Sequence, residues 1–360
     1  MKIFFYEHKY LRNRHIDLVK NFDKDKVSNL EYFNIKKADQ VNKKDSLNIF
    51  KRKNWKQIIP FINLKLRPSK ANKSDLIFIW GGLIINNKFI VEIDNPWAFV
   101  GFNLFSMNLY KNIIKKILFS NNCIEIRCIS QACRRSLVHL FGDKILNKTS
   151  LNYPHHGINK YQRNKIDISN LKKFKILFIG SQFLLKGGPE LLEAFQKIKL
   201  LNKNVHLTLI THLPNQFKDI VENDDFISCF KPNFNRDQIF KIMKKNHLLV
   251  HPSYMESFGM TVLEAMANSL PIITNDIYAL KELVDSDNGY LLKPPITKWN
   301  NHIPNKYFDN NNLFMKDLMK LDKVEYVNSI YQSIKKIILN HDNYNYLCNH
   351  SYKKFVKLTE

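Results

Sequence analysis

The sequence lacks any long apolar segment. None of its apolar runs reaches about 18 uninterrupted residues, the length that a membrane-spanning helix needs. The first residues, MKIFFYEHKYLRNR, meet charges at Lys2 and Glu7 and so lack the apolar core of a signal peptide. We therefore expect a cytoplasmic protein that is at most peripheral to the inner face of a membrane.

Cysteine is also scarce, and the five cysteines make an odd number. Three of them, Cys123, Cys128 and Cys133, are spaced too widely for the short ligand patterns of a zinc site and do not suggest a disulfide framework. This favours a reducing compartment in which the thiols are free and packed.

Acidic residues are few relative to basic ones. The chain has 56 Lys and Arg against 32 Asp and Glu, a net charge of +24. The excess is uneven, because residues 1–150 hold 28 basic and 12 acidic residues, whereas residues 151–360 hold 28 and 20. Either the first half contacts an anionic partner such as lipid headgroups, or the source proteome is rich in Lys, Asn and Ile. No nucleic-acid motif accompanies the charge, so we do not expect nucleic acid as a partner.

Strand and helix patterns alternate in the second half. The predicted strands cover residues 175–180, 205–211, 226–230, 247–251, 271–275 and 289–292, and the predicted helices cover residues 189–201, 215–221, 236–245, 261–268 and 279–284. Such βαβ repetition predicts a parallel, doubly wound sheet, whose ligands bind beyond the carboxyl ends of the strands.

The most informative segment is His251 to Leu292. Its two glutamates, Glu256 and Glu264, are separated by seven residues, and a glycine-containing loop precedes a helix-forming run at residues 261–268. We expect Glu256 in the loop and Glu264 in the first turn, so that the carboxylates flank a helix N-terminus, which favours bound phosphate. Two such carboxylates can accept hydrogen bonds from sugar hydroxyls at both ends of a diphosphate. The pattern therefore indicates a nucleotide-sugar site. His251 itself ends a buried strand, where a structural hydrogen bond is favoured over catalysis.

A second motif that is suited to phosphate binding lies upstream of this segment. The strand at residues 175–180 is followed by a loop with Lys186 and by Gly188-Pro189, a good helix start. A lysine between strand and helix is suited to phosphate, although taken alone it would be a solvated side chain. Both loops follow strands and precede helices, so we expect them to open onto the same edge of the sheet.

Together these segments resemble the retaining GT-B glycosyltransferases of the family 4 type, the glycosyl transferases group 1, which carry a Glu-x7-Glu element. The resemblance implies an α/β GT-B fold, with two Rossmann-like domains and a donor cleft between them. It further implies that Glu256 is catalytic and faces the donor sugar, and that Glu264 holds the ribose hydroxyls. Backbone N–H groups of Gly259, Met260 and Thr261 would meet the sugar and the diphosphate.

Other positions match the family less closely. Ser181 replaces an arginine that usually follows the strand's glycine, so Lys186 is expected to be the main side-chain cation of the donor site. Asp94 falls where the family places a residue facing the reacting sugar, but its Asp-Asn-Pro context also makes a good turn. Phe230 and Lys231 end a strand near the expected nucleobase, or are an ordinary strand exit. Because there is no Asp-x-Asp element, we expect no metal and no cofactor besides the nucleotide-diphosphate sugar.

The first half is organised less clearly. Predicted strands at residues 2–6, 76–80, 89–93 and 123–129, with helices at residues 103–119 and 131–141, are compatible with an acceptor-side Rossmann-like domain at residues 1–157. The family's glycine-rich loop after the first strand is missing, since Glu7-His8-Lys9 occupies that place. We expect the donor-binding domain at residues 158–340. We also expect a final helix within residues 341–360 that packs back on the N-terminal domain.

The resemblance implies transfer of a sugar from a nucleotide-diphosphate donor to an acceptor hydroxyl with retention, in cell-surface polysaccharide or glycolipid synthesis. The expected partners are the nucleotide sugar, a glycan or lipid-linked acceptor and an anionic membrane surface. The alternative is a catalytically degenerate GT-B protein that binds an anionic glycan, lipid or nucleic acid. The presence of both glutamates speaks against that alternative.

Overall fold

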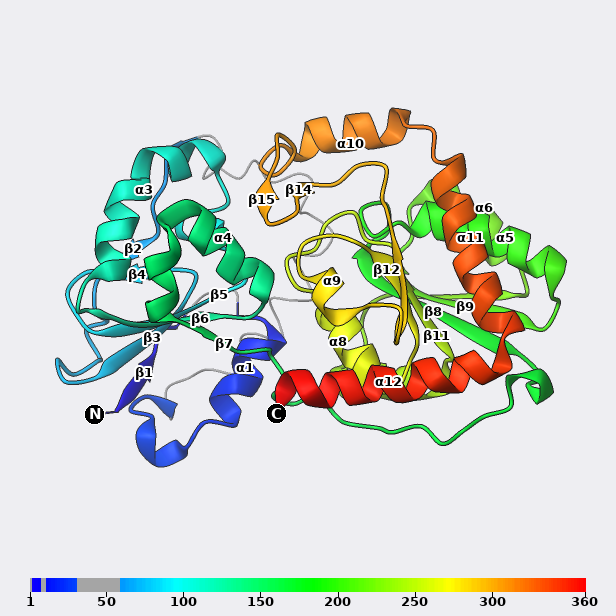
Figure 1. Cartoon of the computed structure of the whole chain (residues 1–360), viewed down its shortest axis with the longest axis horizontal. Coiled ribbons are helices and arrows are strands. Elements are labelled where there is room, and N and C mark those ends of the chain that lie inside the picture. Colours follow the sequence, from blue (N-terminus) through cyan, green and yellow to red (C-terminus); the bar gives the residue numbers. More distant parts are fainter. Residues whose placement is uncertain (1, 8–10, 31–58) are drawn as a thin grey trace. The chain divides into compact units, whose positions relative to one another are not determined.

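The computed structural model describes residues 2–7, 11–30 and 59–360, which form two compact units (Figure 1). Unit 1 comprises residues 1–157 and 299–311, and unit 2 comprises residues 158–298 and 312–360. Each unit is built on its own parallel β-sheet with flanking helices. His8 and Lys9 of the first predicted loop lie outside the described residues.

The sheet of unit 1 has the strand order β1-β3-β5-β6-β7, and all of its strands are parallel. Its strands are β1 (Ile3–Phe5), β3 (Leu76–Trp80), β5 (Phe89–Ile93), β6 (Cys123–Cys128) and β7 (Thr149–Leu151). Its helices are α1 (Asn13–Lys20), α3 (Leu104–Phe119) and α4 (Gln131–Phe141), with short 3-10 turns at η1 (Lys24–Lys26), η4 (Pro96–Val100) and η5 (Asp143–Lys148). A small pair, β2 (Leu64–Lys65) and β4 (Leu83–Ile84), lies beside them.

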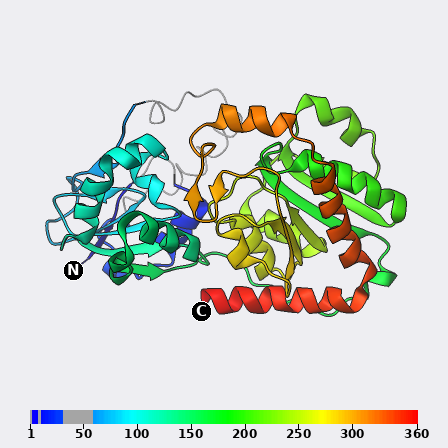
Figure 2. The same ribbon diagram turned by 45° about the horizontal axis from the view of Figure 1, so that its top comes forward.

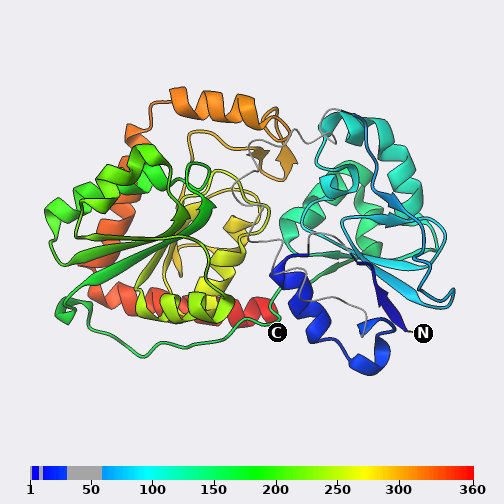
Figure 3. The same ribbon diagram turned by 180° about the vertical axis from the view of Figure 1, so that it is seen from behind.

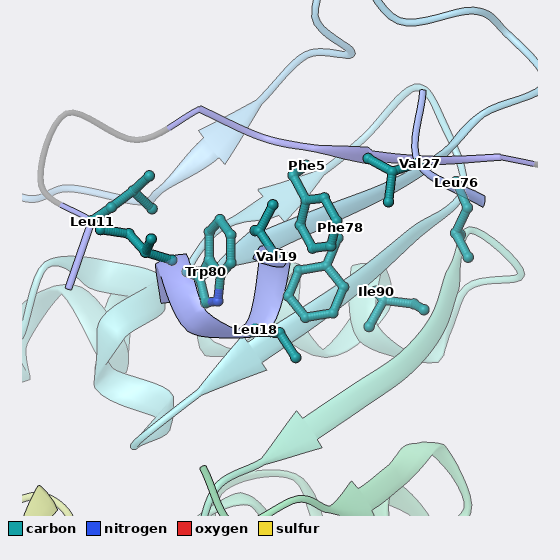
Figure 4. Packing of buried hydrophobic residues seen from close by; sticks show 10 residues of the cluster. Phe5, Leu11, Leu18, Val19, Val27, Leu76, Phe78, Trp80 and Ile90 are labelled. Atoms are coloured by element: carbon teal, nitrogen blue, oxygen red, sulfur yellow. The ribbon is translucent and has the colours of Figure 1, made fainter. Parts of the chain in front are cut away.

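An aromatic core holds α1 against this sheet (Figure 4). Strand side chains alternate between the two faces, so Phe78 and Trp80 of β3 share one face and meet Phe5 of β1. Phe5 stacks on Trp80 with ring centroids 5.8 Å apart, and Leu18 and Val19 of α1 are buried in the same cluster. Helix α1, which has only eight residues, was not predicted.

Unit 2 alternates strands and helices through most of its length. Its strands are β8 (Phe174–Gln182), β9 (Val205–His212), β10 (Ile227–Phe230), β11 (Leu248–His251), β12 (Ile272–Asn275) and β13 (Gly289–Leu292). Its helices are α5 (Gly188–Leu201), α6 (Lys218–Glu222), α7 (Arg236–Lys245), α8 (Met260–Ala267), α9 (Leu280–Leu283), α10 (Asn311–Lys320), α11 (Val324–Leu339) and α12 (His341–Thr359), with 3-10 turns at η6 (Ile168–Asn170) and η7 (Asn215–Phe217). The parallel sheet has the order β10-β9-β8-β11-β12-β13, which is the doubly wound arrangement that the sequence predicts.

The segment after β13 belongs to the first unit rather than to the predicted donor domain. It forms a hairpin of β14 (Trp299–Asn300) and β15 (Ile303–Pro304). Trp299 packs edge-on against Trp97 with ring centroids 6.1 Å apart, and Ser136 Oγ donates a hydrogen bond of 2.6 Å to the carbonyl of His302. A continuous domain at residues 158–340 is therefore not what the structure shows, because these long-range contacts carry residues 299–311 to unit 1.

The final helix packs on the sheet unit that precedes it in the chain. Helix α12 is grouped with unit 2 and runs beside α8 in Figures 2 and 3, and its packing on the N-terminal domain stays a prediction. Ser351 Oγ donates to the carbonyl of Leu270 at 2.7 Å, and Tyr344 Oη donates to the carbonyl of His247 at 3.1 Å. Within the described residues, the combination of length and apolarity that a membrane-crossing helix requires is not found.

Candidate donor site at the switch point of unit 2

The candidate site lies where the strand order of unit 2 reverses. From β8 the chain adds β9 and β10 on one side, and it then returns to add β11 on the other side. The loops after β8 and β11 therefore leave neighbouring strand ends in opposite directions, which is where doubly wound sheets bind ligands. Lys186 lies in the first loop and Glu256 in the second.

Backbone contacts hold the two loops together. The N–H of Tyr254 donates to the carbonyl of Leu185 at 3.0 Å. Gly187 has a φ of +74°, and a Cβ there would lie 2.3 Å from the carbonyl oxygen of Pro252. Only glycine allows this approach, because any side chain would collide with backbone that cannot move away. The lysine and glutamate loops therefore form one rigid surface.

Two side chains from other elements, Asn275 of β12 and Tyr326 of α11, further fix the loop that carries Glu256. Asn275 Nδ2 donates to the carbonyl of Ser253 at 2.9 Å. The buried hydroxyl of Tyr326 donates to Asn275 Oδ1 at 2.6 Å. Buried polar groups joined in this way resist rearrangement, because breaking one bond leaves its partner desolvated and unpaired. The position of the loop thus depends on α11, far along the sequence.

Glu256 is the centre of a charged cluster that is largely shielded from solvent. Its Oε1 atom forms an ion pair with Lys186 Nζ and lies 3.0 Å from His251 Nε2. Lys186 Nζ also donates to the carbonyl of Met255 at 3.1 Å. Burial alone would raise the pKa of Glu256, but Lys186 and His251 outweigh it and lower this pKa to about 2. The carboxylate is therefore firmly ionised, and the hydrogen bond of His251 goes to a candidate catalytic residue.

The N-terminus of α8 follows the loop with Glu256 directly in the chain. Gly259 precedes this helix with a φ of +98°, and a Cβ there would lie 2.4 Å from Leu280 Cδ2. No side chain caps this end of the helix. By helix geometry, the first N–H groups, including those of Met260 and Thr261, have no acceptor within the helix and can meet an anion.

Glu264 lies at the start of the second turn of α8 rather than in the first turn, because the helix begins at Met260, one residue earlier than we expected. Its Oε1 atom is 3.2 Å from an Nη atom of Arg236, and both side chains are largely buried. Burial raises the pKa of Glu264, and the nearby Arg236 opposes this shift. Helix α8 thus carries a carboxylate whose ionised form depends on a partner from α7.

Arg236 was missed by the sequence analysis. It is the first residue of α7, where a cation is unfavourable next to the positive end of the helix dipole. That unusual placement is the signal that could have identified it. The structure explains the placement by the ion pair with Glu264.

The remaining predicted donor residues, Ser181, Phe230 and Lys231, lie at the carboxyl ends of strands of the unit 2 sheet. Ser181 is half-buried near the end of β8, so no arginine occupies that position. Phe230 ends β10, two strands away from β8, and is 45% exposed, followed by the exposed Lys231. The nucleobase role of Phe230 and Lys231 stays a prediction.

Asp94 belongs to unit 1, where it follows β5. Its Oδ1 atom accepts a hydrogen bond of 2.9 Å from the N–H of Asn95, and its Oδ2 atom lies 3.9 Å from Arg12. These contacts fit the turn that the Asp-Asn-Pro sequence predicts. A catalytic role for Asp94 stays a prediction. Among the residues that the structure describes, no group of three His, Cys, Asp or Glu is placed to hold a metal ion.

The candidate site lies within a segment of the chain that matches a known protein family. Residues 161–313 match the model of the family Glycosyl transferases group 1. The two parallel-sheet units have the GT-B fold, which confirms the expected fold class.

Individual relatives are glycosyltransferases. The lipopolysaccharide glucosyltransferase WaaG of Escherichia coli is 26% identical over 126 residues, which are 34% of this chain and 34% of WaaG. An uncharacterized glycosyltransferase of Methanocaldococcus jannaschii is 28% identical over 192 residues, 51% of this chain and 50% of that protein. The alignments thus span no more than about half the length of these curated relatives.

Solved structures match over more of the chain. Anabaena HepE in complex with UDP has a TM-score of 0.60 at 14% identity, covering 100% of this chain and 97% of HepE. The crystal structure of WaaG has a TM-score of 0.53 at 12% identity, covering 98% of this chain and 95% of WaaG. At such identities the likeness concerns the fold.

Proposed function

We propose that the chain is a retaining glycosyltransferase that moves a sugar from a nucleotide-diphosphate donor to an acceptor hydroxyl. The observation that carries the proposal is the joining of Lys186, Glu256 and the N-terminus of α8 at the switch point of the unit 2 sheet. A cation and free helix N–H groups suit a diphosphate, and a flanking carboxylate suits sugar hydroxyls. Solved structures of the same fold support the donor class, since HepE was solved with UDP-glucose and with UDP and glucose.

In this mechanism the diphosphate binds over the start of α8. The N–H groups of Met260 and Thr261 and the ammonium of Lys186 stabilise the negative charge that grows as the bond between sugar and phosphate breaks. The acceptor oxygen then forms the new glycosidic bond, and its proton passes to the departing phosphate oxygen. Retention of configuration requires this oxygen to attack from the face that the phosphate leaves.

The two glutamates have different tasks in the proposal. Glu256 is ionised and accepts hydrogen bonds from the donor sugar next to the breaking bond. Glu264 lies further along α8 and accepts hydrogen bonds from the ribose hydroxyls, held in place by Arg236. No metal takes part, because Lys186 and the helix end neutralise the diphosphate.

The broader setting is also part of the proposal. The relation to WaaG, a lipopolysaccharide glucosyltransferase, supports an acceptor in cell-surface polysaccharide or glycolipid synthesis. We place the reaction in the cytoplasm, and fractionation of the source cells tests this placement.

A donor screen tests the function directly. The intact protein is heated with UDP-, GDP- and ADP-sugars, and one class should raise its melting temperature, as expected for a ligand that binds only the folded state. Release of that nucleotide diphosphate is then measured with glycan acceptors, with and without EDTA. Turnover that survives EDTA supports the metal-independent mechanism. Binding of a nucleotide sugar without transfer or hydrolysis would instead support a degenerate, binding-only GT-B protein.

The lysine has its own test. Lys186→Ala should weaken binding of the nucleotide diphosphate far more than binding of the nucleoside, because only the diphosphate carries the charge that lysine meets. Ser181→Arg should strengthen diphosphate binding by restoring a second cation. If Lys186→Ala leaves diphosphate affinity unchanged, the phosphate site lies elsewhere.

A further inference from the structure

Unit 1 carries a row of polar side chains on the face of its sheet that packs against α1. Glu92 of β5 is paired in register with Trp80 of β3 on one side and with Arg127 of β6 on the other. Cross-strand partners point to the same face of a sheet, and Trp80 belongs to the core that includes α1. Arg14 of α1 approaches the same carboxylate. We call Arg14, Glu92 and Arg127 the guanidinium cluster.

The three side chains of the guanidinium cluster lie near one another but outside hydrogen-bond contact. Arg14 Nη1 is 3.8 Å from Glu92 Oε1, and Arg127 Nε is 4.0 Å from Glu92 Oε2. Charge-assisted hydrogen bonds are shorter, at about 2.7–2.9 Å. Beside the cluster, Arg12 and Asp94 add one charge of each sign and lie 3.9 Å apart. Among these five side chains the positive charges therefore exceed the negative ones.

Arg14 is not satisfied by these neighbours. Its side chain is 8% exposed, and its Nε and Nη1 atoms are buried without a hydrogen-bond acceptor in the part of the chain that the structure describes. Burial lowers the pKa of Arg14, although the carboxylates of Glu92 and Asp94 oppose this shift. A buried guanidinium is costly unless acceptors of good geometry surround it. An anion with several oxygen atoms would supply such acceptors.

The start of α1 favours the same kind of ligand. Arg12 precedes the helix and Arg14 lies in its first turn, which holds no Asp or Glu. Cations are unfavourable at the positive end of a helix dipole, whereas a bound anion is stabilised there. The side chain of Arg12 is 68% exposed and that of Arg127 is 18% exposed, so the group of charges reaches the surface at the carboxyl ends of β5 and β6.

We propose that Arg14 and Arg127 bind an acidic group of the acceptor, a phosphate or a carboxylate. The acceptor role rests on the proposed function, whereas anion binding rests on the geometry of unit 1 alone. Two guanidiniums hold such a group through charge-assisted hydrogen bonds, some of them bidentate. The acceptor sugar then lies at the edge of the unit 1 sheet that carries Asp94.

Glu92 tunes this site. Its carboxylate competes with the incoming anion for both guanidiniums. Burial raises the pKa of Glu92, and Arg14 and Arg127 oppose the shift. Glu92 therefore takes up a proton more readily than an exposed glutamate does when a second negative charge arrives. Replacing Glu92 by glutamine should tighten anion binding, which is the opposite of what replacing Arg14 should do.

NMR titration of the full chain with inorganic phosphate, and separately with acetate, tests anion binding. The Nε–Hε signals of Arg14 and Arg127, assigned through Arg14→Gln and Arg127→Gln, report on unit 1, so phosphate bound at the donor site does not disturb the readout. We expect both signals to shift with one dissociation constant. The anion that binds more tightly identifies the acidic group as phosphate or carboxylate.

The variants separate a binding site from a structural ion pair. Followed at the Arg127 signal, Arg14→Gln should weaken binding at least about tenfold, since it removes charge-assisted hydrogen bonds, and Glu92→Gln should strengthen it. The matched control is Arg134→Gln, because Arg134 of α4 donates to Thr149 Oγ1 at 3.3 Å, outside the cluster, and this variant should bind as the wild type does. If Arg14→Gln fails to fold, Arg127→Gln followed at the Arg14 signal gives the same measurement.

The acceptor role has a separate readout. With the donor that the screen selects, Arg14→Gln should raise the KM for an acidic acceptor and leave the KM for the donor and for the neutral methyl ester of that acceptor unchanged. Anion binding without this change in KM would overturn the acceptor role. Unshifted arginine signals, or weaker binding in both Arg14→Gln and Glu92→Gln, would overturn the anion site. Absence of transfer by the wild type would count against the proposed function, while the NMR shifts would still decide whether unit 1 binds an anion.

Discussion

Replacing Glu256 by glutamine should tighten the binding of UDP or of whichever nucleotide diphosphate the donor screen selects. In the structure the ammonium of Lys186 is paired with the carboxylate of Glu256. A diphosphate must therefore compete with a carboxylate of the protein for the same ammonium. Glu256→Gln keeps the shape of the side chain and removes the competing charge.

The size of the effect follows from the ionisation of Glu256. Lowering its pKa from 4.5 to about 2 corresponds to roughly 3 kcal/mol of interaction favouring the carboxylate, at about 1.4 kcal/mol per pKa unit. Lys186 and His251 share this interaction. If about half of it is lost when the diphosphate takes Lys186, then removing Glu256 tightens diphosphate binding by about tenfold. Turnover should fall in the same variant, because the contact to the donor sugar is weakened.

Calorimetric titration of the nucleotide diphosphate into the wild type and into Glu256→Gln measures this effect. The control is a double-mutant cycle, since in a Lys186→Ala background Glu256→Gln should no longer change the affinity. Uridine, which lacks the diphosphate, should bind both proteins equally.

An unchanged or weaker diphosphate affinity in a folded Glu256→Gln variant would refute the reasoning. So would an equal gain for uridine and for UDP. Either result would mean that Lys186 and Glu256 do not compete as described, and that the ion pair is structural only.

Three further predictions concern the same surface. Glu264→Ala should weaken nucleotide diphosphate binding by roughly 1.5–3 kcal/mol, since it removes a charged acceptor of the ribose hydroxyls, and calorimetry with a folded variant decides whether the ribose assignment stands. The pKa of Glu256 is lower in the folded protein than its usual 4.5, so the stability that its carboxylate contributes is present above pH 4.5 and is lost as the pH falls toward about 2. Denaturant titrations should therefore show the free energies of unfolding of the wild type and of Glu256→Gln converging over this pH range. A difference that stays constant would contradict the ion pair. Gly259→Ala should destabilise the protein by about 1–3 kcal/mol, because its φ of +98° strains any residue with a Cβ and Leu280 Cδ2 would have to move. A thermal melt equal to that of the wild type would show that the loop adapts.

The regular elements of unit 2 could be predicted from the sequence because their signals are local. Apolar runs of strand length alternate with helical periods, and the observed strands agree with the predicted ones to within a few residues. Their order in the sheet follows from the βαβ pattern, and so does the meeting of the Lys186 and Glu256 loops at one edge.

The first half was harder for a physical reason. Its sheet is assembled from strands far apart in the chain, such as β1 and β3, and the core that joins them uses only a few residues of α1. A short helix of this kind is stabilised by tertiary burial rather than by its own propensity, so its sequence carries little signal.

The sequence by itself indicated the fold class and the residue types at the candidate donor site, because these depend on spacing and periodicity. Only the tertiary structure decided which charges meet. Lys186 and Glu256, or Arg236 and Glu264, are paired by loop geometry and helix packing that no local pattern encodes. The same holds for residues 299–311, which pack on unit 1, and for α12, which packs on unit 2. Contacts between distant segments depend on how complete surfaces fit together, and that fit exists only in the folded chain.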